Sequence, residues 1–349
     1  MSKIFRKTRQ YLLSEGKTKT YLKYAIGEIA LVVIGILIAL GINNWNQRIN
    51  TEEKITTILK EIQSDILIDL EASNMIFNYH MLTDSISKNI LNNKYTPEDF
   101  RNGTFKSVGY NYRDFKTTQN GFDNLSDNLD NIPKKYKHLL PEIKNLYVTL
   151  NTTIDVYNDK IRSVVYKNMD DFTNFNWHQD YLLGKENNEQ MDYYLNDAKY
   201  KNLVAKYMRY RTGIFQISTE YRTKAIDLYL KINEAINSTV KAPEIVNYKN
   251  KSSDNYTGIY KLKETVNLDG RWEANYKIIE RNDQLVLISP KYNHELKLLS
   301  YNKNTFYYNE IIYNQLILGL LIFDKPKKDH LYISIDVNSF AIYERIESN

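Results

Sequence analysis

The sequence predicts an α+β, membrane-anchored protein: one N-terminal transmembrane helix, an extracytoplasmic antiparallel helical bundle, and a C-terminal antiparallel β meander or small barrel. An unbroken apolar run near the N-terminus, apolar residues at helical spacing through the middle of the chain, and a change to a period of two near residue 256 predict these three parts. The expected boundaries are 1–23 for a cytoplasmic basic tail, 24–46 for the transmembrane helix, 47–242 for the bundle, 243–255 for a linker and 256–346 for the β-domain.

Residues 29–42 form the apolar run and contain no polar side chain. Extending the run back to Tyr24 adds only one charged residue, Glu28, and gives a helix that spans about 28 Å, close to the hydrocarbon thickness of a bilayer. Tyr24 and Trp45 stand at its two edges, where aromatic side chains favour the membrane interface. The run also holds a small-xxx-small pair, which lets helices approach closely. The residues expected to matter in this anchor are Tyr24, Glu28, Gly35, Ala39 and Trp45.

Gly35 and Ala39 are the two members of the small-xxx-small pair. Glu28 has two interpretations: a carboxylate that reaches the cytoplasmic headgroups, or a partner in an intramembrane helix contact. Two other interpretations of the whole run also stay open, namely a buried core helix and a signal peptide cleaved after Gly41. A core helix rarely needs fourteen unbroken apolar residues, and a leader of 41 residues is long, so a retained anchor is preferred.

The basic residues gather before the apolar run. The whole chain has a net charge of +5, yet residues 1–23 hold seven Lys or Arg against one Glu, so the remainder is close to neutral. A nucleic-acid-binding protein needs a basic patch on its folded part, and this distribution argues against nucleic acid as a partner. By the positive-inside rule, the tail stays in the cytoplasm and the later domains lie in the periplasm. We therefore expect a single-pass protein of the bacterial inner membrane.

The region after Trp45 is predicted to be helical. An apolar stripe continues along a first long helix to about residue 90 and includes Leu82, and Pro97 ends that helix. Residues 98–120 are expected to form a loop, residues 121–131 a short helix, and residues 191–240 another long helix. Between the short helix and the second long helix lies a three-heptad seam of apolar residues, which suits bundle packing or a parallel oligomer. The seam consists of Ile143, Tyr147, Leu150, Ile154, Tyr157, Ile161 and Val164.

The region after residue 256 is predicted to be β-structure. Eight short runs with strand-like patterns follow one another in about 90 residues, and HELKLLS (294–300) is one of them. Turn signals such as Asp269-Gly270 and Lys325-Pro326 separate several of these runs. We expect a meander that closes into a small barrel. A barrel of this size is normally filled by its own side chains, and a ligand pocket inside it is the alternative.

Two segments resemble known families. The run YAIGEIALVVIGILIALGINNWN, at residues 24–46, resembles the hallmark of a family of uncharacterised single-pass membrane proteins of Bacteroidota, and residues 121–147 look like a counterpart segment of that family. This resemblance implies an inner-membrane anchor and a soluble helical region, and it implies no activity. The C-terminal pattern YTGIYKL…DQLVLIS…LKLLSYNKNTFYY is similar to the small lipocalin-like β-domain that trails many bacterial serine hydrolases, where it carries no catalytic residue.

The sequence offers little of the chemistry that enzymes use. It has no cysteine, and its five histidines are not at metal-ligand spacing on a helix. Residues 85–88, 126–128 and 211–213 approximate the three motifs of penicillin-recognising hydrolases, but the third lies in a helical pattern where that fold needs a strand. We expect no enzymatic activity and no cofactor.

The function expected from these features is that of a membrane-anchored periplasmic binding, scaffold or accessory protein. The alternative is a ligand-sensing module that works with a separate signalling or envelope partner. The expected partners are the membrane and either another protein or a second copy of this chain. The sequence names no small-molecule ligand.

Overall fold

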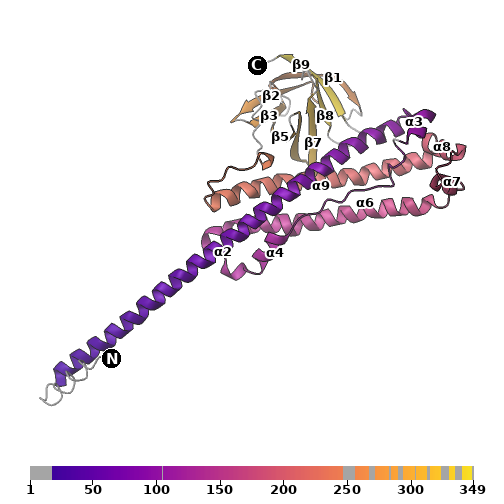
Figure 1. The fold of residues 1–349 in the computed structure, drawn as a ribbon. Coiled ribbons are helices and arrows are strands. Elements are labelled where there is room, and N and C mark those ends of the chain that lie inside the picture. Colours follow the sequence, from indigo (N-terminus) through magenta and orange to yellow (C-terminus); the bar gives the residue numbers. More distant parts are fainter. Residues whose placement is uncertain are drawn as a thin grey trace.

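The computed structural model describes residues 18–103, 105–246, 256–266, 272–282, 284–289, 294–302, 304–312, 315–323, 330–334 and 340–347. Within these residues, one very long helix extends beyond a helical bundle, and a curved β-sheet lies against one side of the bundle (Figure 1). Most of the expected basic tail lies outside the described residues, as does the side chain of Tyr24.

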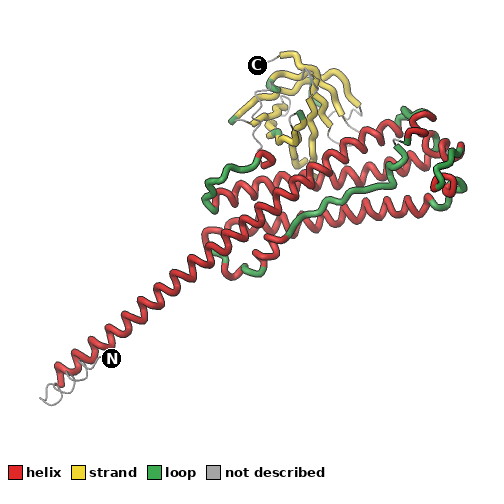
Figure 2. Tube along the Cα trace, in the orientation of Figure 1, coloured by secondary structure: helices red, strands yellow, loops and turns green. Residues whose placement is uncertain are grey.

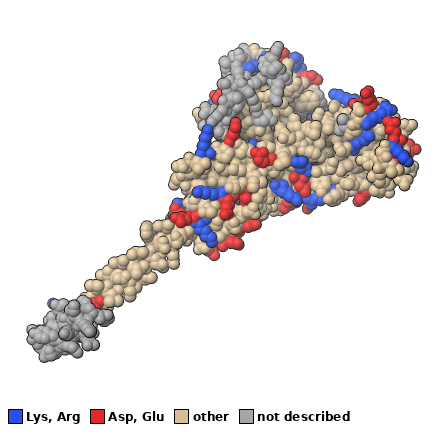
Figure 3. All heavy atoms as spheres, in the orientation of Figure 1, with Lys and Arg blue, Asp and Glu red and all other residues tan. Residues whose placement is uncertain are grey.

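Helix α2 (Thr18–Leu91) combines the apolar run and the first bundle helix in 74 continuous residues. The sequence places a domain boundary at residue 46, and the helix passes through it because no Gly or Pro occurs between residues 42 and 91. The side chains of residues 29–50 are mostly exposed, whereas Ile55 is buried in the bundle. This shaft bears few charged side chains, in contrast to the body of the protein (Figure 3).

The other helices form the bundle together with the second half of α2. The two longest are α6 (Asn151–Phe172) and α9 (Ala198–Ala235). The shorter helical elements are α3 (Pro97–Asn102), α4 (Asn120–Ser126), η1 (Leu129–Asn131), η2 (Lys134–Leu139), α5 (Leu140–Lys144), η3 (Asn145–Leu150), α7 (His178–Leu182), α8 (Asn188–Leu195) and η4 (Glu244–Val246).

The bundle is not wholly antiparallel, which corrects the sequence prediction. Residues 111–119 return along the bundle without regular structure, so that α6 starts near the same end as the bundle part of α2 (Figure 2). Helices α2 and α6 therefore run in the same direction, and α9 runs against both. The short helix α3 cannot continue past residue 102, because the Gly103 and Gly109 backbones have φ angles of 75° and 88°, which break a helix. The chain instead returns along the bundle before α6 begins, and this return gives α6 the same direction as α2.

The helix expected over residues 191–240 is two helices, α8 and α9. Asn196 and Asp197 separate them, and the Asp197 side chain accepts a hydrogen bond from the Lys199 backbone N–H at 2.7 Å. Asp and Asn side chains compete with the helical backbone and favour such N-cap positions. The apolar stripe alone did not reveal this break, since it continues in phase on both sides.

The expected seam lies inside the single chain. Its members belong to α5, η3 and α6, which follow one another without a break, and η3 is a π-helical turn. Six of the seven residues are buried and Tyr157 is half-buried. The stripe on α2 is less regular than predicted, because Leu82 is 62% exposed. An α-helix drifts relative to a heptad pattern, and near this point His80 and Thr83 face the interior instead.

Buried polar side chains hold the returning segment against the helices. The Asn158 side-chain amide binds both the N–H and the carbonyl of Phe115, at 3.1 and 2.7 Å. Asp69 accepts from the Thr118 backbone N–H at 2.8 Å, and Asp65 accepts from the Gly121 N–H at 2.7 Å. Backbone groups that cannot pair within a sheet or helix must find such partners when buried.

We expect Asp69 to make folding pH-dependent. Burial raises its pKa from 3.8 to about 6, although hydrogen bonds from Tyr221 and Thr118 oppose the shift. Because the folded-state pKa lies above the unfolded one, the stabilisation is complete below about pH 4 and is lost as pH rises through about 6. The loss amounts to about 3 kcal/mol at most. Urea unfolding between pH 4 and 7 should therefore show this decline in the wild type.

The matched variants for this test are Asp69→Asn and Asp155→Asn, the second being an exposed carboxylate on α6. The Asp69→Asn protein should lack the Asp69 part of the decline, because the amide does not ionise but can still accept from Thr118. The Asp155→Asn protein should follow the wild type. If the Asp69→Asn curve runs parallel to the wild-type curve over this range, the assignment is wrong.

The β-domain contains nine strands in the described residues, one more than the sequence predicts. The extra strand arises because HELKLLS divides at Leu298, which is buried and donates its N–H to the Leu285 carbonyl at 2.9 Å. The strands are β1 (Gly258–Val266), β2 (Asn275–Arg281), β3 (Gln284–Ser289), β4 (His294–Lys297), β5 (Leu299–Asn302), β6 (Thr305–Ile312), β7 (Gln315–Phe323), β8 (His330–Ser334) and β9 (Phe340–Glu347).

The sheet curls into a nearly closed barrel. Its order is β4-β3-β2-β1-β9-β8-β7-β6-β5, with all described neighbours antiparallel. The two outer strands, β4 and β5, are separated in sequence by Leu298 alone, so the two edges of the sheet must meet. Aromatic side chains fill much of the core, including Tyr256, Phe306 and Phe323. This packing agrees with the expectation that a small barrel is filled by its own side chains.

Candidate ligand site between the bundle and the barrel

The barrel docks on α2 and α9 through a small aromatic cluster. Phe77 of α2 stacks on Tyr301 of β5, with 4.3 Å between the ring centroids. The hydroxyls of Thr219 and Tyr301 lie 2.5 Å apart, and those of Thr223 and Tyr307 lie 3.2 Å apart. These contacts join α9 to β5 and β6. The two parts of the protein are therefore held together by both apolar packing and hydrogen bonds.

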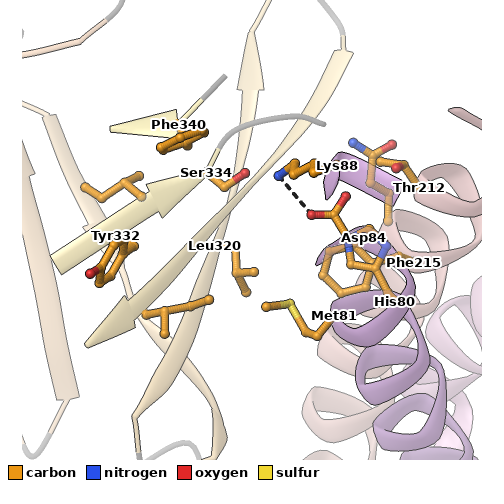
Figure 4. A pocket seen from close by; sticks show the side chains of 13 residues that line it. His80, Met81, Asp84, Lys88, Thr212, Phe215, Leu320, Tyr332, Ser334 and Phe340 are labelled. Carbon is orange, nitrogen blue, oxygen red and sulfur yellow. Dashed lines mark ion pairs between the residues drawn. The ribbon is translucent and has the colours of Figure 1, made fainter. Parts of the chain in front are cut away.

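A cavity of about 290 Å³ lies beside this cluster, between the helices and the barrel. Figure 4 shows side chains from α2 and α9 on one wall and from β7, β8 and β9 on the other. This volume is near the lower end for small-molecule sites. Most of the lining is apolar, with a few polar groups. The described lining residues are His80, Met81, Asp84, Lys88, Thr212, Phe215, Gln216, Leu320, Ile322, Tyr332, Ile333, Ser334 and Phe340.

One carboxylate lies between two cations at the helical wall. Asp84 forms an ion pair of 2.8 Å with Lys88, one turn later on α2. Its other oxygen lies 3.3 Å from Nη2 of Arg211, which is buried on α9. A charge-assisted hydrogen bond is usually about 2.7–2.9 Å long, so the Lys88 contact has the length of such a bond and the Arg211 contact is longer. Within the described residues, Nε and Nη1 of Arg211 have no hydrogen-bond partner.

His80 lies one turn before Asp84 on the same wall. Its ring stacks on Phe215 with 4.1 Å between centroids and an interplanar angle of 7°. Burial lowers the pKa of His80 well below its usual range, and the positive charges of Arg211 and Lys88 lower it further. The imidazole is therefore neutral near pH 7. Its Nδ1 is buried and has no hydrogen-bond partner among the described residues.

The residues that sequence analysis selected lie elsewhere. Glu28, Gly35, Ala39 and Trp45 lie along the shaft of α2, and the seam lies in the bundle core. Neither group lines the cavity. The spacing of His80, Asp84 and Lys88 on one face of α2 could have drawn attention to this wall. Arg211 and Thr212 belong to the segment that approximates a hydrolase motif in the sequence, and they lie inside a helix as expected.

The described residues do not bring together three His, Asp or Glu side chains that could hold a metal ion. The candidate site is a mostly apolar cavity whose helical wall carries the Asp84–Lys88 ion pair, with the buried Arg211 in contact with Asp84. Such a site can bind a small molecule that has an apolar body and a polar head.

The comparisons with known proteins add a family of unknown function. Residues 28–102 match the family described as "Family of unknown function (DUF6090)". The matched stretch contains the whole apolar run, α2 from Glu28 onward and α3, and it includes His80, Asp84 and Lys88. It agrees with the expected resemblance to an uncharacterised family. No curated protein and no solved structure matches the chain.

Proposed function

We propose that this protein is a single-pass, membrane-anchored binding protein of the bacterial inner membrane. In this proposal the basic tail lies in the cytoplasm, the first part of α2 crosses the bilayer, and the bundle and barrel lie in the periplasm. The exposure of the shaft carries the proposal. Among the described residues, α2 is the helix that is long and apolar enough to cross a membrane, and its most apolar window is 0% buried.

The energetic reason is the amount of apolar surface on this shaft. Eleven Val, Leu and Ile side chains between residues 26 and 42 are each at least 46% exposed. Fully burying a side chain of this type contributes about 1.5–3 kcal/mol, so the transfer of this segment into lipid is favourable by on the order of 20 kcal/mol. A core helix, the first alternative from the sequence, would need a covering partner along this whole length.

The cavity supports the binding role. It lies on the body of the protein, has apolar walls and carries a few polar groups, as ligand sites do. The lipocalin-like resemblance of the β-domain fits a binding role too, but the cavity lies at the junction with the helices rather than among the core residues of the barrel. The anchor would keep the body that carries the binding site tethered to the membrane. A scaffold role needs no such cavity.

A sensing role is the second candidate function, and the continuity of α2 favours it. The same helix carries the proposed anchor and four lining residues, His80, Met81, Asp84 and Lys88. A ligand that shifts this part of α2 would displace the shaft as well, because the helix has no break between the two sites. The separate signalling or envelope partner would then read the position of the shaft.

The orientation is tested with reporters fused after Asn349. A reporter that works only in the periplasm should be active, and one that works only in the cytoplasm should be inactive, because the seven basic residues of the tail hold the N-terminus inside. Replacing those seven residues by Gln should reduce periplasmic activity. Replacing the same number of exposed lysines in the body should not. Activity of the cytoplasmic reporter alone would overturn the proposed orientation.

Membrane attachment is tested by alkaline carbonate extraction of whole membranes. We expect the full-length chain to remain in the pellet. A variant in which Val33, Leu37 and Leu40 are replaced by Lys should be recovered in the soluble fraction, because each Lys in the bilayer costs about 3 kcal/mol. The variant also loses three of the eleven apolar side chains, and the two effects together offset most of the transfer free energy. Recovery of the wild-type chain in the soluble fraction would contradict the anchor.

A further inference from the structure

We propose that the cavity between the bundle and the barrel binds a monomeric amphiphile with one carboxylate head and an apolar tail of about ten carbons. This inference rests on the proposed binding function and names the ligand class of the same site. The apolar side chains of the two walls receive the tail, and Lys88 receives the head.

The size of the tail follows from the cavity. A water-sized group occupies roughly 30 Å³, so 290 Å³ accommodates about ten such groups. The tail would contact Met81 and Phe215 on the helical wall, and Leu320 and Ile322 on the barrel wall. Figure 4 shows Met81 and Leu320 facing each other across the space. The cavity opens to solvent, so the carbons of a longer chain would extend beyond its apolar walls.

The sign of the head follows from the charges at the helical wall. Two cations, Lys88 and Arg211, share one carboxylate, Asp84, and His80 is neutral. Within the described lining, Asp84 balances Lys88, and the excess positive charge comes from the buried Arg211, which contacts Asp84 but does not itself line the cavity. An anionic head can pair with Lys88, whereas a cationic head would compete with Lys88 and Arg211 for Asp84. A neutral head gains only hydrogen bonds.

The existing ion pair does not prevent this exchange. When the ligand pairs with Lys88, Asp84 can move from Lys88 to Arg211, where Nε and Nη1 have no described partner. Arg and Asp can then form the two parallel hydrogen bonds that their planar groups favour. The buried guanidinium gains the acceptors that it lacks, and neither Lys88 nor Asp84 loses its countercharge. One lysine suits a singly charged carboxylate better than a phosphate.

The ligand is expected to enter as a free molecule rather than as a lipid still held in the bilayer. Asp84 lies 42 residues beyond Ile42 on the same helix, which corresponds to about 60 Å at 1.5 Å per residue. A lipid tail in the bilayer cannot cover that distance. In the proposed orientation, the ligand therefore comes from the periplasmic solution or from a carrier.

The test uses the full chain in lipid nanodiscs, so that no detergent competes for the cavity. Decanoate, decanol and decylammonium have the same tail and differ in the charge of the head. Binding is measured by titration calorimetry, and carboxyl-¹³C-labelled decanoate reports the environment of the head by NMR. Met81→Trp and Gln216→Trp, which fill the cavity from different helices, provide the background from lipid uptake. Circular dichroism checks that each variant is folded.

We expect saturable decanoate binding in the wild type, at least tenfold weaker binding of decanol, and no saturable binding of decylammonium. Lys88→Gln should weaken decanoate about tenfold and leave decanol unchanged. Lys60→Gln, at an exposed position on the same helix, should change neither. Both Trp variants should abolish saturable binding, and the ¹³C resonance of bound decanoate should shift in the wild type but not in Lys88→Gln.

The other outcomes separate the two proposals. Equal affinity for decanoate and decanol, lost in the Trp variants, would overturn the carboxylate head and leave the binding function in place. Tighter binding of decylammonium would overturn the sign of the head. Binding that survives in both folded Trp variants, or no saturable binding of any of the three probes to the wild type, would overturn the amphiphile site altogether. The membrane orientation would still be decided by the reporter fusions.

Discussion

Replacing Gly121 by Ala should destabilise the bundle by about 3 kcal/mol or more. A Cβ atom at this position would lie 2.5 Å from the Ile62 backbone nitrogen and 2.9 Å from the Glu61 carbonyl carbon. Both contacts are with backbone, so the side chains cannot relieve them, and α4 must move away from α2. The same movement lengthens the hydrogen bond from the Gly121 N–H to Asp65, which leaves a buried carboxylate underpaired.

The control for this prediction is Asn120→Ala, at an exposed position one residue earlier in α4. A surface substitution of this kind changes stability by about 0.5 kcal/mol or less. Denaturant unfolding followed by circular dichroism measures both variants. Equal midpoints for Gly121→Ala and Asn120→Ala would show that α4 does not pack this closely on α2.

Replacing Leu150, Ile154 and Tyr157 together by Ala should also destabilise the bundle by several kcal/mol. Leu150 and Ile154 are 5% and 0% exposed, and truncation of a buried Leu or Ile to Ala costs about 2–5 kcal/mol. Tyr157 lies against Gly213 at the contact between α6 and α9, where a Cβ on the glycine would come within 2.4 Å of the tyrosine ring. Its removal therefore opens a gap at this contact between the two helices.

Val148 and Val156 provide the matched control for the seam. They belong to the same helical stretch and are 41% and 46% exposed. Their replacement by Ala should leave the unfolding midpoint nearly unchanged, because little apolar surface is lost from the core. If the triple variant melts at the wild-type temperature, the seam is not part of a cooperative core.

The order and type of the elements could be predicted from the sequence where a pattern is long and local. The apolar run, the seam and the change of period near residue 256 each extend over many residues, so single exceptions do not obscure them. Breaks within these elements, where a side chain or a neighbouring strand competes for backbone hydrogen bonds, were harder to predict. Asn196 and Asp197 interrupt a continuous stripe by capping, and Leu298 divides one strand candidate by turning its backbone toward Leu285.

The direction of α6 and the candidate site could not be predicted, since both depend on long-range contacts. The return of residues 111–119 relies on buried amide and carboxylate groups such as Asn158 and Asp69, which look like surface residues in a sequence. The cavity forms only when α2 meets β7 and β8, more than 200 residues later in the chain. The polar spacing on α2 was visible, but its opposite wall was not.

The exposed stretch between the apolar run and the bundle separates the body of the protein from the surface of the bilayer in the proposed orientation. An ion pair between Glu52 of α2 and Lys135 of the body lies ten residues beyond Ile42. Ten helical residues rise about 15 Å, whereas the headgroup layer beyond the hydrocarbon is about 6 Å thick on each side. In the proposed orientation, the body therefore stands several ångströms clear of the lipid. It can tilt on a single helical stalk without desolvating its charged underside.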